Sequence, residues 1–181
     1  MNTDTSLNPT PLPISYIGTL QEALKFSDAD AALNRTGTIS SAQKKRLERA
    51  WSRLLIGGLI GIAAVTIAAT FAFFMAQRQS SFILQAAGIA LTFFNAFIVI
   101  RLAQSRIRLN TDINGAVTRT EGIVRHTVRI SGRTARYLLE VNGERMLVEK
   151  PVFFAFEDNR RYALYRTAAS KTLISAEKLE L

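Results

Sequence analysis

Two long runs of uncharged residues constrain this chain more than any other feature of its sequence. The first, Leu54–Ala76, has 23 residues, and the second, Phe82–Ile100, has 19. A helix rises about 1.5 Å per residue, so about 20 residues cross the roughly 30 Å hydrocarbon layer of a bilayer. Only residues 77–81 separate the runs, so we expect a transmembrane helical hairpin. The alternative, two buried helices of a soluble domain, is disfavoured by apolar runs of this length.

The charged residues that flank the runs predict their orientation. Arg78 alone lies in the connecting turn, whereas basic residues gather before the first run and after the second. The positive-inside rule then places both termini in the cytoplasm, as expected for a multi-pass protein of the cell (plasma or inner) membrane. The residues predicted to lie at the membrane interface, which faces an anionic inner leaflet, are Lys44, Lys45, Arg46, Arg49, Trp51, Arg53, Arg101, Arg106 and Arg108.

Four residues inside the runs are candidates for helix packing. Gly57 and Gly61 form a G-x-x-x-G pair, which lets helix backbones approach closely, either within the hairpin or between two chains. Gln85 and Asn95 carry amides that seek partners in hydrocarbon, across the hairpin or in another subunit. The runs hold no ionisable residue, so the sequence gives no sign of a transport pathway.

The residues before the first run predict a tail followed by a helical arm. Thr19 with Glu22, and Ser40 with Gln43, have the spacing of capping boxes, and no helix breaker follows Gln43 before the first run. The expected segments are a flexible tail (1–18), a cytoplasmic helical arm with a basic juxtamembrane helix (19–53), the first span (54–76), an external turn (77–81), the second span (82–100), a basic juxtamembrane linker (101–113) and a cytoplasmic β domain (114–181).

Part of the arm resembles a segment found elsewhere. Residues 26–43 contain Asn34, Arg35, Gly37, Ser40 and Gln43. In these residues the chain resembles small uncharacterised bacterial two-span membrane proteins with a cytoplasmic C-terminal β domain. The resemblance implies a compact helix–turn–helix ahead of the membrane, with its Asn-Arg pair in a tight turn, and it implies no activity.

The residues after 114 have the pattern of a small β domain. Val124, His126, Val128 and Ile130 alternate with polar residues, which is the period of a half-buried strand. Asn142-Gly143 predicts a type I′ hairpin turn. Further strands are expected over residues 161–166 and 172–176, with one helical turn over residues 152–156. About five strands predict a small OB- or SH3-like barrel or rolled sheet.

Together these segments predict an α+β membrane protein. The arrangement is similar to that of bacterial membrane proteins of the NfeD type, which carry a small OB-like barrel below membrane helices. Such a likeness of architecture does not imply a function.

An enzyme is not expected from this sequence. The chain has no cysteine and only one histidine, which excludes thiolate chemistry and a multi-histidine metal site within one chain. No hydrolase, metalloprotease or nucleotide-binding motif occurs. His126 shares the phase of its apolar neighbours, so we expect a structural histidine rather than a general base. We therefore assign no catalytic residue, cofactor or metal.

The basic residues of the β domain leave two classes of partner. Residues 101–181 hold 15 basic and 9 acidic side chains, and Arg125, Arg129, Arg133 and Arg136 share one predicted hairpin. We expect a non-catalytic anchoring, assembly or regulatory module that presents this domain to a protein partner or to a second copy of the chain. The alternative is a membrane-tethered domain that binds nucleic acid or anionic lipid, although glutamates on the neighbouring strands disfavour a nucleic-acid groove.

Overall fold

The computed structural model of the chain describes residues 19–131 and 134–179, so the predicted tail and Arg133 lie outside the described residues. The chain divides into two compact units. The first, here called the β unit, contains the described residues up to 32, residues 119–166 and those from 173 onward. The second, the hairpin unit, contains residues 33–118 and 167–172. The sequence placed residues 19–53 in a single arm, whereas these units divide that arm after residue 32.

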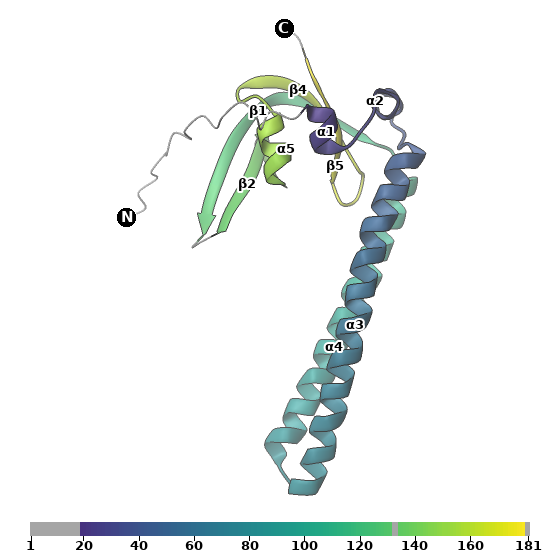
Figure 1. Cartoon of the computed structure of the whole chain (residues 1–181), viewed down its shortest axis with the longest axis vertical. Coiled ribbons are helices and arrows are strands. Elements are labelled where there is room, and N and C mark those ends of the chain that lie inside the picture. The colour runs from purple at the N-terminus through teal and green to yellow at the C-terminus, as the bar shows by residue number, and fades with distance from the viewer. Residues whose placement is uncertain (1–18, 132–133, 180–181) are drawn as a thin grey trace, which may run out of the picture. The chain divides into compact units, whose positions relative to one another are not determined.

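The hairpin unit contains two long helices that pack side by side, α3 (Ser41–Gln79) and α4 (Phe82–Asn114) (Figure 1). Both are long and apolar enough to cross a membrane. The predicted capping box starts α3: the Ser40 hydroxyl accepts from the Gln43 N–H, and the Gln43 side chain accepts from the Ser40 N–H. The helix then continues unbroken from the basic segment through the first apolar run.

The connection between the helices is shorter than the sequence predicted. Residues 77–79 belong to the last turn of α3, and Ser80 ends the helix with a φ of 50°. The Ser81 hydroxyl then caps α4 by accepting from the Leu84 N–H. At the other end of α4, residues 101–113 are helical, so the predicted linker extends the second apolar helix by more than three turns.

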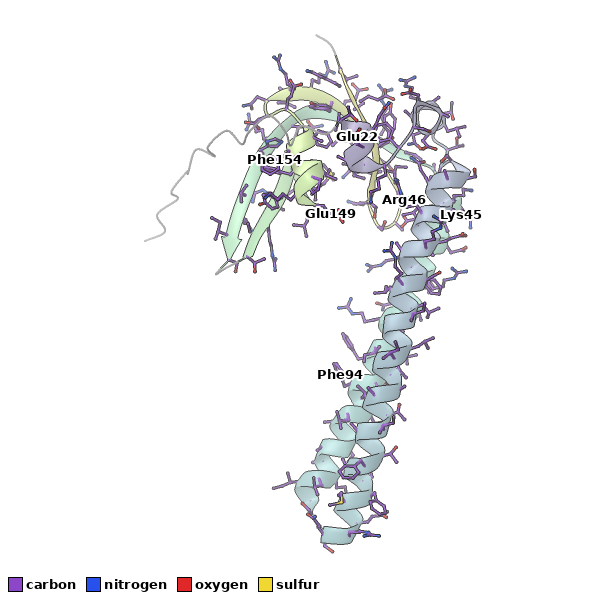
Figure 2. The ribbon with its side chains drawn as sticks, viewed as in Figure 1. Glu22, Lys45, Arg46, Phe94, Glu149 and Phe154 are labelled. Atoms are coloured by element: carbon purple, nitrogen blue, oxygen red, sulfur yellow. The ribbon has the colours of Figure 1, made fainter. Side chains whose placement is uncertain are left out.

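Small residues form the contact between α3 and α4. Ala69, Ala72, Ala76 and Gly88 are buried, whereas most large apolar side chains of both helices are exposed, Ile67 at 71%. Phe94 projects from α4 in the same way (Figure 2). The described apolar surface of the helices therefore faces outward rather than into a shared core.

Two short helices precede α3, and a side-chain cap starts each of them. Helix α1 (Leu20–Leu24) starts after Thr19, whose hydroxyl accepts from the Glu22 N–H at 3.3 Å. Helix α2 (Asp28–Arg35) starts after Ser27, which exchanges two hydrogen bonds with Asp30. These reciprocal bonds satisfy backbone donors that a helix start leaves unpaired.

A tight turn connects α2 to α3. Gly37 has a φ of +80°, which a glycine adopts without strain, and its N–H bonds the Asn34 carbonyl at 3.0 Å. The implied helix–turn–helix is therefore present, but the Asn34-Arg35 pair forms the last turn of α2 rather than the connecting turn.

The β unit contains one open sheet with the strand order β3-β2-β1-β4-β5. Asn142 and Gly143 both have positive φ, as the predicted type I′ turn between β2 and β3 requires. Strands β3 and β5 form the two edges, so the sheet is not closed into a barrel. The strands are β1 (Thr118–Ser131), β2 (Thr134–Val141), β3 (Glu144–Val148), β4 (Arg160–Arg166) and β5 (Leu173–Lys178), and helix α5 (Lys150–Ala155) follows β3.

The core of the β unit lies on one face of this sheet. Val124, Leu139 and Leu164 are fully buried there, and Phe153 of α5 packs over them. Leu24 of α1 joins the same cluster, so the start of the N-terminal arm supplies part of the core. A β domain of this size is only marginally stable by itself, so the packing of α1 against it adds needed stability.

Candidate functional site

The face of β1, β2 and β3 that lies opposite α5 carries three parallel rows of side chains, here called the outer face. The middle row joins Thr127, Leu138 and Leu147 across the three strands. On one side of it Arg129 faces Arg136, and on the other side Arg125 faces Glu140, which faces Arg145. Side chains alternate between the faces of a strand, so these rows share one surface.

Three of the four predicted surface arginines lie on this outer face. Arg125, Arg129 and Arg136 are exposed, and among the described residues none of them forms an ion pair. Arg133 lies outside the described residues. The remaining arginines of the described β unit are all paired: Arg119 and Arg161 with Glu121, Arg145 with Glu140, Arg160 with Glu157, and Arg166 with Glu144.

The register places two of the unpaired arginines directly opposite each other. Arg129 of β1 and Arg136 of β2 are cross-strand partners. Opposed side chains in such a pair have Cβ atoms about 5 Å apart, and like charges there are destabilising. An anionic group bound between the two guanidinium groups would remove this repulsion.

The middle row gives the outer face an apolar strip. Leu147 of the edge strand β3 is 67% exposed, and Leu138 beside it is half-buried. Strand β3 has no neighbour on its other side, so its outer backbone groups face away from the sheet. The outer face therefore combines unpaired cations, an apolar strip and an open edge.

The opposite face carries His126. Its ring stacks on Phe153 with centroids 4.2 Å apart, and its backbone N–H donates to the Asp158 carboxylate at 2.8 Å. Burial lowers the pKa of His126, and the nearby Asp158 charge opposes this effect only in part. The inward orientation predicted for His126 is confirmed. No cluster of three metal-binding side chains occurs among the residues that the structure describes.

The C-terminal end of β1 is less buried than its alternating sequence pattern predicted. Val128 is 42% exposed and Ile130 is 68% exposed, although both share the face of the buried Val124. Phe153 and Phe154 of α5 pack against Tyr137, the cross-strand partner of Val128. The described residues provide no such cover next to Ile130, so β1 and β2 extend beyond the core.

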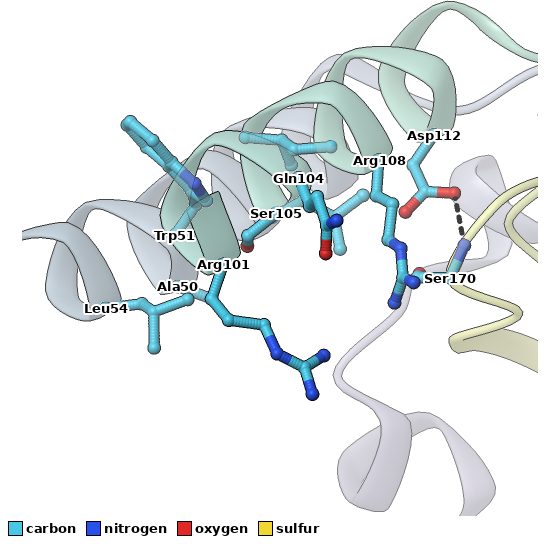
Figure 3. Close-up of a pocket in the computed structure, with 11 residues that line it drawn as sticks. Ala50, Trp51, Leu54, Arg101, Gln104, Ser105, Arg108, Asp112 and Ser170 are labelled. Atoms are coloured by element: carbon cyan, nitrogen blue, oxygen red, sulfur yellow. Dashed lines mark hydrogen bonds between the residues drawn. The ribbon is translucent and has the colours of Figure 1, made fainter. Parts of the chain in front are cut away.

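The predicted interface residues lie on α3 and α4. Arg106 of α4 lies over the Trp51 ring of α3 at 4.7 Å, and Arg101 lies over Phe97 at 5.2 Å. Trp51, Arg101 and Arg108 line a groove between the two helices (Figure 3). Arg53 lines a second groove, and the remaining predicted residues, Lys44, Lys45, Arg46 and Arg49, lie in the first turns of α3 and line neither groove.

The four residues predicted to pack the helices together differ in the contacts that they make. A Cβ atom added at Gly57 or Gly61 would meet nothing within 4 Å, so this pair makes no close contact within the described hairpin. Gly58 makes that contact instead, against Leu102. Asn95 bonds across the hairpin as predicted, donating to the Thr66 hydroxyl at 2.7 Å. The Gln85 side chain is exposed and forms no hydrogen bond to another described residue.

One polar residue of the groove was missed by sequence reasoning. The carboxylate of Asp112 is almost fully buried and accepts hydrogen bonds from the backbone N–H groups of Ala169 and Ser170, at 2.7 and 2.9 Å. These partners are more than fifty positions away, so no local pattern reveals the contact. Asp112 lies near the C-terminal end of the predicted linker, in the last turns of α4.

Comparison with models of protein families and with curated proteins gave no match to this chain.

Proposed function

We propose that the chain is a non-catalytic integral membrane protein that anchors the β unit and presents its outer face to an acidic protein partner. Helices α3 and α4 span the cell membrane in this proposal, with both termini in the cytoplasm. Its role is anchoring, assembly or regulation of that partner.

The composition of the two helices supports insertion into a bilayer. Each contains an 18-residue window with a mean hydropathy above 2, of which only 6% is buried by the protein itself. Exposing so much apolar surface to water is unfavourable, whereas hydrocarbon accepts it. The basic residues that precede one window and follow the other favour the orientation with both termini inside.

Cysteine labelling tests this topology. The chain has no natural cysteine, so Gln79→Cys and Ser170→Cys each introduce a single thiol. An impermeant maleimide added to intact cells is expected to label the first thiol, and the second only after the cells are opened. Labelling of Ser170→Cys alone in intact cells would contradict the orientation.

The opposed Arg129–Arg136 pair is the observation that carries the proposed partner. The two cations repel each other without a neutralising acid among the described residues, and they border the exposed Leu147. A partner segment with acidic and apolar side chains fits both features. The open edge of β3 could hydrogen-bond such a segment as an added strand.

Photo-crosslinking in living cells tests the partner. A photoreactive phenylalanine analogue replaces Leu147 in the full chain, and mass spectrometry identifies the crosslinked peptide. We expect an Asp- and Glu-rich protein segment. The adduct should be lost in Arg129→Gln/Arg136→Gln, which also relieves the repulsion and so leaves the β unit folded.

The matched control is Arg119→Gln/Arg160→Gln, which removes the same charge from paired arginines of the same unit. This control should keep the adduct. An adduct that is equally insensitive to both double variants would contradict the proposed surface. An arginine-dependent adduct to lipid or nucleic acid would instead establish the alternative polyanion function.

A further inference from the structure

A groove of about 510 Å³ lies between α3 and α4 just beyond their uncharged runs. Trp51 comes from α3, whereas Arg101, Gln104 and Arg108 come from α4 (Figure 3). The spacing of i, i+3 and i+7 places these three side chains on one face of α4. The two arginines are about 10 Å apart along the helix axis.

The groove offers hydrogen-bond donors that the described protein does not use. Arg101 and Arg108 form no ion pair with a described residue, and the Trp51 Nε1–H is buried without an acceptor there. Asp112 also lines the groove, but its carboxylate is engaged by the backbone of Ala169 and Ser170. An incoming anion therefore meets two guanidinium groups, which bind phosphate oxygens through paired hydrogen bonds.

A second groove, of about 480 Å³, continues from the first toward the apolar part of the helices. The two share Leu54 and Arg101 in their walls. The second is lined by Gly57, Phe94 and Leu102 among others, and a Cβ atom at Gly57 would meet only open space. A polar groove thus joins an apolar one at Arg101, which suits a ligand with a charged head and a hydrocarbon tail.

We infer that the joined grooves bind an anionic phospholipid, with its phosphate between Arg101 and Arg108 and one acyl chain along Gly57. The inference rests on the proposed insertion of α3 and α4, which places Arg101 at the level of the inner-leaflet headgroups. Basic pockets between membrane helices on that side recognise anionic headgroups. A soluble phosphate ester shares the head chemistry but leaves the apolar groove unfilled.

Fluorescence quenching tests the site, because Trp51 is the only tryptophan of the chain. The full chain is reconstituted into phosphatidylcholine bilayers that contain a small fraction of lipid brominated near the carbonyl end of its acyl chains. Brominated phosphatidylglycerol is expected to quench Trp51 at a concentration about tenfold lower than brominated phosphatidylcholine, since charged hydrogen bonds stabilise its binding. Added glycerol phosphate should not reverse the quenching.

Three variants locate the binding. Arg101→Gln/Arg108→Gln should abolish the preference for phosphatidylglycerol, and Gly57→Leu, which fills the second groove, should weaken quenching by that lipid. The matched control Lys45→Gln/Arg49→Gln removes two exposed cations of α3 outside both grooves and should keep the preference.

Two results would overturn the inference. One is equal quenching by both brominated lipids in the unmodified chain, and the other is a preference that Lys45→Gln/Arg49→Gln removes as fully as Arg101→Gln/Arg108→Gln does. Reversal by glycerol phosphate would assign the site to a soluble phosphate ester instead. Flotation of the vesicles after an alkaline wash reports insertion separately, so a chain that fails to insert contradicts the proposed function and not the groove.

Discussion

The hairpin unit and the β unit use the same apolar residue types in opposite ways. In the two apolar runs of the hairpin, large side chains such as Ile67 and Phe93 are more than 70% exposed, and the buried residues are alanine and glycine. In the β unit, Leu139, Leu164 and Tyr162 are at most 1% exposed. Large apolar side chains stabilise a fold where they are removed from water, which the β unit achieves by itself and the hairpin would achieve in the bilayer of the proposed function.

Side-chain size therefore has a different role in each unit. The β unit is stabilised by filling space with large residues, so it is sensitive to truncation. The hairpin is stabilised by the close approach of two backbones, so it is sensitive to enlargement. Matched substitutions in the two units separate these roles.

Leu139→Ala should lower the stability of the chain more than any other substitution considered below. Truncating this fully buried residue removes its packing and leaves a cavity, which should lower the unfolding free energy of the β unit by about 3 kcal/mol. Ile67→Ala removes an exposed side chain and should change the stability of the hairpin by less than about 1 kcal/mol. Hydrogen exchange with mass spectrometry on the reconstituted chain resolves both units. Equal losses of unfolding free energy from Leu139→Ala and Ile67→Ala would show that the hairpin buries large apolar side chains as the β unit does.

The elements of the fold were predictable because each has a local signal. Two apolar runs gave α3 and α4, and Ser40 with Gln43 marked where α3 begins. The alternation of apolar and polar residues and the Asn142-Gly143 turn predicted strands β1, β2 and β3. The positive φ values of this turn are ones that asparagine and glycine adopt readily. The packing partner of α1 was not predictable, because Leu24 shows an apolar position without showing which surface it covers.

Gly88→Val should cause the second largest loss of stability. A Cβ atom at this position would lie 3.0 Å from three atoms of the Phe73 ring, so the helices must separate or the ring must move. We expect a loss of about 2 kcal/mol in hairpin stability. Gly61→Val is the matched control, since its Cβ would meet nothing within 4 Å. Denaturation by dodecyl sulfate in mixed micelles measures both. A larger loss for Gly61→Val would indicate that Gly61 packs against a second chain.

The candidate sites were less predictable than the elements, for reasons of geometry. The sequence put Arg125, Arg129 and Arg136 on one hairpin, but only the strand register sets Arg129 opposite Arg136. The G-x-x-x-G spacing pointed to Gly57 and Gly61, whereas Gly58 meets Leu102. A helix that is apolar on every side does not show which face meets its neighbour.

A smaller effect is expected for Asn95→Leu. This change removes the 2.7 Å hydrogen bond to the Thr66 hydroxyl, and such bonds within membrane proteins contribute about 0.6 kcal/mol on average. Gln85→Leu is the control, because the Gln85 side chain forms no hydrogen bond with a described residue. Dodecyl sulfate titration of Asn95→Leu, Thr66→Val and the double variant Asn95→Leu/Thr66→Val gives a double-mutant cycle, and the Gln85→Leu control is titrated in the same way. A coupling energy of zero between positions 66 and 95 would contradict the bond.

The smallest effect is a pH dependence confined to the β unit. Burial lowers the pKa of His126 below its ordinary value of 6.5, so the unfolded chain binds this proton more tightly than the folded chain does. The contribution of His126 to the unfolding free energy of the β unit is therefore fully present above about pH 6.5. It is lost as the pH falls from there through the pKa that His126 has in the folded chain. The carboxylate of Glu157, whose pKa is lowered by its hydrogen bond to Lys178, titrates in a more acidic window.

Thermal unfolding of the full chain between about pH 8 and about pH 5.5 isolates the histidine from the carboxylates. His126→Phe can keep the stacking on Phe153 without a titrating group, so the melting temperature of its β unit should be flat over this range. The unmodified chain should lose a small part of its stability toward pH 5.5, with the hairpin unit unaffected. The opposite slope would mean that the Asp158 charge dominates over burial at His126, and that the folded β unit takes up a proton there.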